Sequence, residues 1–289
     1  MMRSKYTRPV RLGEQGEGGQ QGASRLTTSA MIASLVAPGQ RTKAAPFGQA
    51  LVELAKSRPQ ILGLTADLAK YTDLHVFAKA YPDRFYQMGM AEQLLICTAA
   101  GMAREGFVPF ATTYAVFAAR RAYDFICLAI AEENLNVKIA CALPGLTTGY
   151  GPSHQATEDI AIFRAMPKLT IVSSGFMTMR ALEAIKMLQD SHIDVGVLHV
   201  PTIKPLDEAT ILEAASQSGR MVIVAENHTI IGGLGEAVAG LLLRSGVMPA
   251  AFRQIALPDE FLDAGALPTL HDRYGISAAA MARSIKGWQ

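Results

Sequence analysis

Short apolar segments alternate with segments of helical periodicity along most of the chain beyond residue 45. Val137–Ala142 and Met221–Ala225 are nearly unbroken runs of apolar residues. Runs of this kind are typical of parallel strands covered on both faces, whereas half-exposed strands alternate apolar and polar residues. Between them, apolar residues recur at the three- and four-residue spacing of helices. The alternation therefore predicts an α/β fold built on mainly parallel sheets.

The pattern places each element approximately. The predicted strands cover 61–65, 84–88, 107–112, 137–142, 169–173, 193–199, 220–225 and 251–256. The predicted helices begin at Pro46, a residue suited to a first helical turn, and then cover 90–104, 115–132, 156–165, 178–189, 207–217 and 234–244. The stretch 201–206 is predicted as a loop that leads into a helix capped by Asp207.

Length and composition suggest two folded domains behind a tail. The 289 residues are half hydrophobic and 18% charged, which excludes global disorder. Residues 1–42 are predicted to be a disordered tail, because 13–22 contain five glycines and three glutamines without apolar periodicity. The predicted domains are 43–172 and 173–289, with the boundary at the polar stretch that follows Val172.

Charge and hydropathy exclude several partners. The net charge is only +2, and it comes from the first 43 residues, which hold seven basic and two acidic side chains. This balance gives no indication of a nucleic-acid or membrane surface. No apolar run reaches the ~18 residues of a membrane span. Three cysteines without CxxC spacing (Cys97, Cys127 and Cys141) lie in apolar stretches, so we expect buried, reduced thiols and a cytoplasmic protein.

Three segments at predicted strand ends could support chemistry, because reactive groups collect at the carboxyl ends of parallel strands. Glu92 falls in the first turn of a predicted helix, where it could equally stabilise the helix dipole. Tyr114 and Phe117 are three residues apart and share a helical face, which is also typical of core packing. His154 follows a loop rich in glycine and proline, and a structural role is open for it as well.

A fourth segment, Glu226-Asn227-His228 followed by Gly232-Gly233-Leu234-Gly235, is similar to a dinucleotide-binding turn. It is not GxGxxG, and no acidic residue follows at a second strand end, so it is a weak nucleotide signal. The sequence contains no GxSxG, Walker A or HExxH motif.

Taken together and in order, the segments resemble the pyrimidine-binding and C-terminal domains of the transketolase family over residues 43–289. The matching text is GMAEQ (89–93), PFATTYAVFAARRAYD (109–124), LNVKIACALPGLTTGYGPSHQATEDIAIFRAMP (135–167), VLHVPTIKPLD (197–207) and AENHTIIGGLGEAVA (225–239). The wording is similar to the B subunits of split transketolases of the apulose-4-phosphate type, in which a separate chain carries the diphosphate-binding domain.

The resemblance implies a role for each candidate residue. Glu92 matches the glutamate that hydrogen-bonds N1′ of the thiamine diphosphate aminopyrimidine, so that N4′ can take the proton of thiazolium C2. Tyr114 and Phe117 match aromatic residues that pack against this ring. His154 matches a histidine that faces the substrate channel. Thr65 and Asp67 match a strand-end loop near the cofactor.

Two departures from the family change the expectation. The text Gly149-Tyr150-Gly151 replaces a segment whose acidic residue recognises a substrate hydroxyl. About two strand–helix units, on the order of 60 residues, are also missing where Val172 runs into Ser173. The sequence contains no GDG-type segment for the diphosphate and its Mg²⁺. We therefore expect no metal ligands here, a separate N-terminal diphosphate-binding subunit, and a heterotetramer that includes self-association.

The predicted function is thus that of a transferase subunit (EC 2.2.1.-). It would move a two-carbon ketol unit between sugar phosphates, with apulose 4-phosphate as a candidate substrate. Two alternatives stay open at this point. The chain could be the β-type subunit of a 2-oxoacid dehydrogenase E1, which shares the glutamate and the C-terminal domain. It could also be a catalytically impaired assembly subunit, because of the missing segment after Val172.

Overall fold

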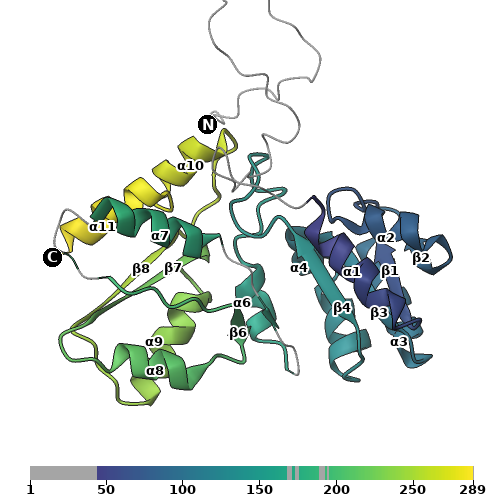
Figure 1. Ribbon diagram of the computed structural model, residues 1–289, viewed down its shortest axis with the longest axis horizontal. Coiled ribbons are helices and arrows are strands. Elements are labelled where there is room, and N and C mark those ends of the chain that lie inside the picture. Colours follow the sequence, from purple (N-terminus) through teal and green to yellow (C-terminus); the bar gives the residue numbers. More distant parts are fainter. Residues whose placement is uncertain (1–43, 168–170, 173–175, 189–192, 194, 289) are drawn as a thin grey trace, which may run out of the picture.

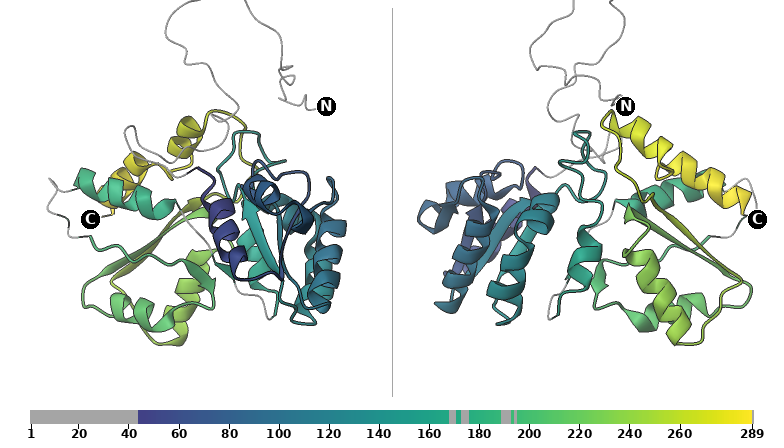
Figure 2. Two further views of the ribbon diagram at one scale, coloured as in Figure 1. Left: turned by 45° about the vertical axis from the view of Figure 1, so that its right-hand side comes forward. Right: turned by 180° about the vertical axis from the view of Figure 1, so that it is seen from behind.

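The computed structural model describes residues 44–167, 171–172, 176–188, 193 and 195–288. These residues form two α/β units that lie side by side in all three views (Figures 1 and 2). The predicted α/β class and mainly parallel sheets are confirmed. The tail predicted for residues 1–42 lies outside the described residues, as does residue 43.

The first unit is built on a four-stranded parallel sheet in the order β2-β1-β3-β4. Its strands are β1 (Ile61–Thr65), β2 (Phe85–Gln87), β3 (Val108–Tyr114) and β4 (Lys138–Ala142). Thr65 at the end of β1 lies opposite both Gln87 and Thr112. The register therefore brings the carboxyl ends of all four strands to one edge, where the loops that carry the candidate residues begin.

Helices cover both faces of this sheet. They are α1 (Pro46–Lys56), α2 (Leu74–Ala80), the 3₁₀ turn η2 (Pro82–Arg84), α3 (Glu92–Arg104), α4 (Ala115–Arg121), α5 (Tyr123–Ile126), the π-helical turn η3 (Cys127–Ala131) and α6 (Asp159–Arg164). One core joins α1 and α2 to β1, and another joins α3 and α5 to the opposite face. The single helix predicted over 115–132 is wrong, because Ala122 leaves helical geometry at φ −114° and ψ 4°.

The second unit has less sheet than the sequence predicts. Its strands are β5 (Ile171–Val172), β6 (Thr202–Lys204), β7 (Met221–Thr229) and β8 (Ala251–Leu257). β7 pairs with β8 in parallel, and β5 pairs with β6 in antiparallel. Of the strand predicted over 193–199, residues 193 and 195–199 are described and contain no strand. A strand forms instead in the predicted loop, where the Lys204 Nζ donates to the carbonyls of Arg164 and Met166 and holds β6 against the end of α6.

Helices also sandwich the second parallel sheet. They are α7 (Met177–Leu188), α8 (Glu208–Ala215), α9 (Leu234–Arg244), α10 (Leu267–Arg273) and α11 (Ala278–Gly287). Figure 1 shows α7 and α11 on one side of β7 and β8, and α8 and α9 on the other. The predicted cap of α8 is confirmed, because Asp207 accepts a hydrogen bond from the Thr210 amide. None of the helices in this described part has the length and apolar character needed to cross a membrane.

The connecting loop, residues 143–158, ties the two units together. Leu146 follows β4, the last strand of the first sheet along the chain, yet it is fully buried in the core of the second unit. Its amide donates to the Asn227 side chain at 2.9 Å, and its carbonyl is 2.8 Å from His271 Nε2. Gly145 has φ +59°, and a Cβ atom there would lie 2.0 Å from the Asn227 carbonyl oxygen. Only glycine therefore fits this crossing without displacement of the backbone.

The cysteines depart from the expectation of buried thiols. Cys97 and Cys141 are exposed and Cys127 is partly buried, and all three are free. Cys141 has accessible surface because it faces an internal cavity. Burial nevertheless raises the pKa of its thiol to about 12, so the group stays protonated at neutral pH.

The crossing at Gly145 predicts a large effect of one methyl group. We expect Gly145→Ala to lower the free energy of unfolding by about 2 kcal/mol or more, through positive φ and the contact with Asn227. Gly101→Ala is the matched control, since it lies in α3 with no atom near its added Cβ, and should raise the stability by about 0.5–1 kcal/mol. Urea unfolding of both variants checks this, and equal stabilities would contradict the close crossing.

Candidate functional site

Glu92 and Arg121 form a partly buried ion pair at the carboxyl edge of the first sheet. Glu92 lies in the first turn of α3, and its side chain is only 3% exposed. Arg121 Nη1 donates to both carboxylate oxygens, at 3.2 and 3.4 Å. The Arg121 side chain itself is 49% exposed. A carboxylate this deep requires a partner, and the structure supplies it from the end of α4.

An aromatic cluster lies beside this pair. It consists of Tyr114, Phe117, Tyr150 and His154. Phe117 has its ring centroid 5.6 Å from that of Tyr114 and 5.4 Å from that of His154. His154 is also 5.3 Å from Tyr150. The Arg121 guanidinium covers the Phe117 ring at 4.0 Å, so the cluster and the ion pair form one continuous site.

The surroundings of Tyr114 and His154 favour the neutral forms of both side chains. Burial, with smaller effects of Tyr71 and Tyr150, raises the pKa of Tyr114 to about 12. Burial and then the nearby Arg121 charge lower the pKa of His154. A neutral imidazole can both donate and accept a hydrogen bond. A buried carboxyl, flat aromatic faces and an imidazole together suit a planar heterocycle that exchanges protons.

Arg120 fixes the part of the connecting loop that carries His154. Its guanidinium donates to both Glu158 oxygens and to the carbonyls of Pro152 and Gln155. The loop is therefore tied to α4 on both sides of His154. This bidentate geometry is one that lysine could not reproduce.

Thr65 and Asp67 have other partners. The Thr65 hydroxyl is buried, donates to the Thr112 carbonyl and accepts from the Leu68 amide. Asp67 accepts a hydrogen bond from the Gln87 side-chain amide, and its own amide donates to the same side chain. Leu68 packs against the buried apolar cluster that contains Tyr114, so this strand-end loop borders the aromatic cluster. The structure thus joins Glu92, Tyr114, Phe117 and His154 directly, and Thr65 and Asp67 only through the loop.

Sequence reasoning missed the two arginines that organise the site. Arg120 and Arg121 come three and four residues after Phe117 in the sequence. Two consecutive charges at the end of an otherwise apolar helix were the available signal. The sequence does not predict which residue each arginine contacts, because neighbouring helical positions point about 100° apart and reach different partners.

A second polar cluster lies where α6 meets the end of β7. Glu226 accepts hydrogen bonds from the amides of Leu234 and Gly235, at 2.6 and 2.8 Å. This carboxylate therefore occupies the start of α9, the position that a bound phosphate would take in a dinucleotide turn. His228 is fully buried, accepts from the Ala161 amide, and lies 4.0 Å from Asp159. The weak nucleotide signal is thus an internal helix cap.

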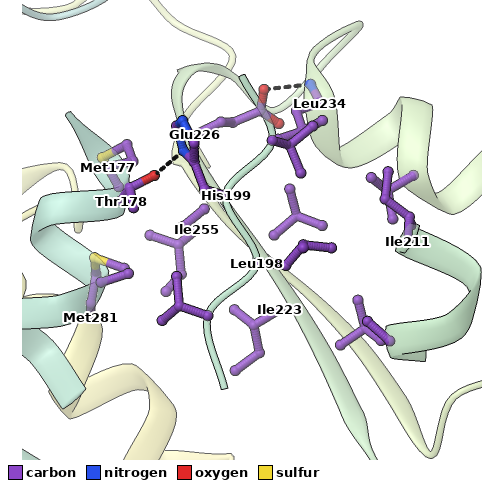
Figure 3. Close-up of a pocket in the computed structure, with 18 of the residues that line it drawn as sticks. Met177, Thr178, Leu198, His199, Ile211, Ile223, Glu226, Leu234, Ile255 and Met281 are labelled. Carbon is purple, nitrogen blue, oxygen red and sulfur yellow. Dashed lines mark hydrogen bonds between the residues drawn. The ribbon is translucent and has the colours of Figure 1, made fainter. Parts of the chain in front are cut away.

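A large cavity runs along β7 of the second unit (Figure 3) and reaches β4 of the first unit. It measures about 1170 Å³ and is lined mainly by aliphatic side chains. All residues from Met221 to Asn227 in β7 line it, as do Ile139 and Cys141 of β4. β7 pairs only with β8, and β4 only with β3, among the described residues. The cavity therefore runs along two sheet edges that are open among the described residues, and Thr178, His199 and Glu226 are among its polar lining residues.

Metal binding finds no support in the described part of the chain. Nowhere in it do three or more histidine, cysteine, aspartate or glutamate side chains group so that they could hold an ion.

Two family profiles match the chain. The profile described as "Transketolase, pyrimidine binding domain" matches residues 41–184, and "Transketolase, C-terminal domain" matches residues 159–281. The two matches overlap over 159–184, the stretch that contains α6, β5 and the start of α7.

Two proteins of known sequence illustrate the likeness. The chain is 58% identical to "Putative uncharacterized transketolase family protein y4mN" of Sinorhizobium fredii, covering 100% of this chain and 99% of the relative. It is 29% identical to "6-deoxy-6-sulfo-D-fructose transketolase subunit SqwH" of a Clostridium species, covering 81% and 90%. The alignment with the Sinorhizobium protein spans 347 positions, which exceeds the 289 residues of this chain by 58.

A solved structure gives the same likeness in three dimensions. The chain matches a "Split gene transketolase, inactive beta4 tetramer" with a TM-score of 0.74 and 32% identity. The match covers 84% of this chain and 96% of that one.

The buried carboxyl at Asp159 predicts a pH-dependent stability. Burial raises its pKa to about 7, and the hydrogen bond from the Ile160 amide opposes this with a smaller effect. The folded protein therefore holds a proton that the unfolded chain releases near pH 4, and this stabilisation fades as pH rises toward 7. Between pH 4 and 7, we expect the free energy of unfolding of the wild type to fall by up to about 1.4 kcal/mol per pH unit relative to that of Asp159→Asn.

The comparison between variants is needed because other groups titrate in the same range. Glu226 has its pKa raised to about 7, while those of His154, His228 and His271 are lowered by burial. These groups remain in both proteins, and the contributions of those that do not contact Asp159 cancel in the difference, whereas His228 lies 4.0 Å from Asp159. Urea unfolding at several pH values measures it, with the exposed Asp83→Asn as control. Parallel pH profiles of wild type and Asp159→Asn would refute the assignment.

Proposed function

The chain belongs to the transketolase family, and we propose that it is one subunit of a split, thiamine diphosphate-dependent transketolase. In this proposal it transfers a two-carbon ketol unit between sugar phosphates, with apulose 4-phosphate as candidate substrate. The observation that carries the proposal is the buried Glu92 carboxyl next to the aromatic cluster, at the carboxyl edge of a parallel sheet. The three free cysteines fit a cytoplasmic, reducing compartment.

The residues of the site fit the aminopyrimidine half of this cofactor. Glu92 offers one buried carboxyl for a ring nitrogen, and Phe117 and Tyr114 offer flat apolar surfaces. When bound, thiamine diphosphate supplies a thiazolium carbon nucleophile and an electron sink for carbonyl chemistry. Glu92 would hold the proton at the ring nitrogen, and the aromatic residues would exclude water from the ring.

His154 is placed to act on the sugar. Its ring borders Phe117 and Tyr150, and Ser153 Oγ lies 2.9 Å from its Nδ1, which leaves Nε2 for a substrate oxygen. The lowered pKa of His154 keeps the ring neutral, so it can donate to or accept from a hydroxyl group. Arg120 keeps the loop in place on both sides of this histidine.

A partner subunit completes the proposed enzyme. Met90 and Leu94, which flank Glu92 in sequence, are 80% and 53% exposed. Large apolar side chains at this exposure mark an interaction surface when they cluster. The relative from Clostridium is itself called a subunit, and the solved split-gene chain is a tetramer. We propose that a diphosphate-binding chain, which holds Mg²⁺, covers this surface in a heterotetramer.

Removal of the Glu92 carboxyl tests the catalytic proposal. With the candidate partner, thiamine diphosphate, Mg²⁺ and ketose phosphates, we expect Glu92→Ala to reduce ketol transfer by about 100-fold or more. Glu105→Ala, at the exposed end of α3, should leave the rate unchanged. The rate of aldose phosphate release measures both. Equal rates for wild type and Glu92→Ala would defeat the proposal, and 2-oxoacid decarboxylation by the pair would favour a dehydrogenase E1 subunit.

A second candidate function is that of a catalytically impaired assembly subunit. The open edges of β4 and β7, the cavity between them and the 58 extra alignment positions support it. Parallel strands are normally paired on both sides and covered on both faces. A segment that supplied further strands would close both edges and fill this space.

Insertion of the missing segment separates the two candidates. We propose that the additional residues of the Sinorhizobium relative belong between Val172 and Ser173, and we expect their insertion there to raise Tm and to abolish binding of an apolar dye to the cavity. A scrambled insert of equal length is the control. Ketol transfer that appears only with the native insert would identify this chain as the impaired form, and equal transfer without it would identify a working enzyme.

A further inference from the structure

We propose that Arg121 occupies the aminopyrimidine position of the cofactor site and must move out before the ring can bind. The inference rests on the proposed function, since it assigns Glu92 and Phe117 to the cofactor. It adds that the Arg121 side chain competes with the cofactor for this position and therefore lowers the affinity for the cofactor.

The two contacts of Arg121 are the two that the ring would make. Its Nη1 donates to both oxygens of Glu92, at 3.2 and 3.4 Å. Its planar guanidinium lies over the Phe117 ring at 4.0 Å. A pyrimidine that stacks on Phe117 and hydrogen-bonds Glu92 is also planar and needs the same aromatic face and the same carboxyl. One flat group can be present there at a time.

The neighbouring arginine shows which of the two can move. Arg120 makes four hydrogen bonds to the connecting loop, two of them with Glu158. Among the described residues, the Arg121 side chain donates hydrogen bonds to Glu92 alone. Arg121 is the last residue of α4, and half of its side chain is in solvent. Its long side chain can therefore rotate outward without disturbing the helix or the loop.

The exchange has a physical reason. Before the cofactor arrives, a buried Glu92 carboxylate without a partner would destabilise the site. Arg121 satisfies it and shields the apolar ring of Phe117 from water. The ligand must displace both contacts, so its observed affinity is lower than that of an open site.

Binding of the ring alone tests the inference. The probe is 4-amino-5-hydroxymethyl-2-methylpyrimidine, titrated into the full chain and followed by ligand-observed NMR. We expect Arg121→Ala to lower its Kd by about 3- to 10-fold. Arg104→Ala is the matched control, because it removes a surface arginine that pairs with Glu133, and should leave Kd unchanged. Guanidinium chloride at about 20 mM should weaken binding to Arg121→Ala, whereas urea at the same concentration should not.

Two further arms separate the outcomes. Glu92→Ala and Phe117→Ala should weaken binding of the ring to an Arg121→Ala background. If Arg121→Ala binds the ring with the same or lower affinity than the wild type, while Glu92→Ala and Phe117→Ala still weaken binding, Arg121 does not compete with the ring. The proposed function stands in that case. Absence of ring binding by every variant overturns the inference too, and ketol transfer by the reconstituted wild type then decides the proposed function. Arg121→Lys guards against misfolding, since it keeps the charge but loses the flat face, and should give an intermediate Kd.

Discussion

The packing of the connecting loop against the second unit is the contact on which the site depends. Backbone groups that leave water must find partners, and in this loop the partners come from the other unit. The amide of Leu146 donates to Asn227, and the Gln155 side chain donates to the carbonyl of Asp263. The Thr229 amide donates in the opposite direction, to Thr157. Because these bonds bracket His154, the second unit fixes a residue that the first unit carries.

The site proper is governed by the desolvation of one carboxylate. Glu92 is buried at the start of α3, where the helix dipole favours a negative charge, and Arg121 completes its neutralisation. The adjacent Arg120 has a different task, since it ties the loop around His154 to α4. The two consecutive arginines thus have different roles. The helix directs Arg120 toward the loop, which it holds in place, and directs Arg121 toward α3, where it balances the charge of Glu92.

The sequence predicts the first unit better than the second. Runs such as 61–65 and 137–142 match strands, because each is short, apolar and followed by a helix. The predicted strand over 193–199 has the same local character but forms no strand in its described positions. Pairing is a non-local property, and among the described residues no strand other than β8 pairs with β7. The predicted burial of Cys141 is wrong for the same reason. Its sequence neighbours are apolar, but the residue faces the cavity between two open sheet edges. Of the site, sequence could name Glu92, Tyr114, Phe117 and His154, but not the arginines that arrange them.

The cavity and the site are separable, and this limits what the open edges can impair. Glu92, Arg121, Tyr114 and Phe117 lie on α3, α4 and the end of β3, whereas Tyr150 and His154 lie on the connecting loop. The cavity lies along β7 and the outer edge of β4, and both Ala115 of α4 and Pro144 of the connecting loop border it. Loosening of the second sheet would therefore reach His154 through Asn227 and Asp263, while Glu92 and Phe117 kept their positions. In a chain with this architecture, the position of His154 on the substrate side would therefore be lost before the surface of Glu92 and Phe117 that receives a planar ring.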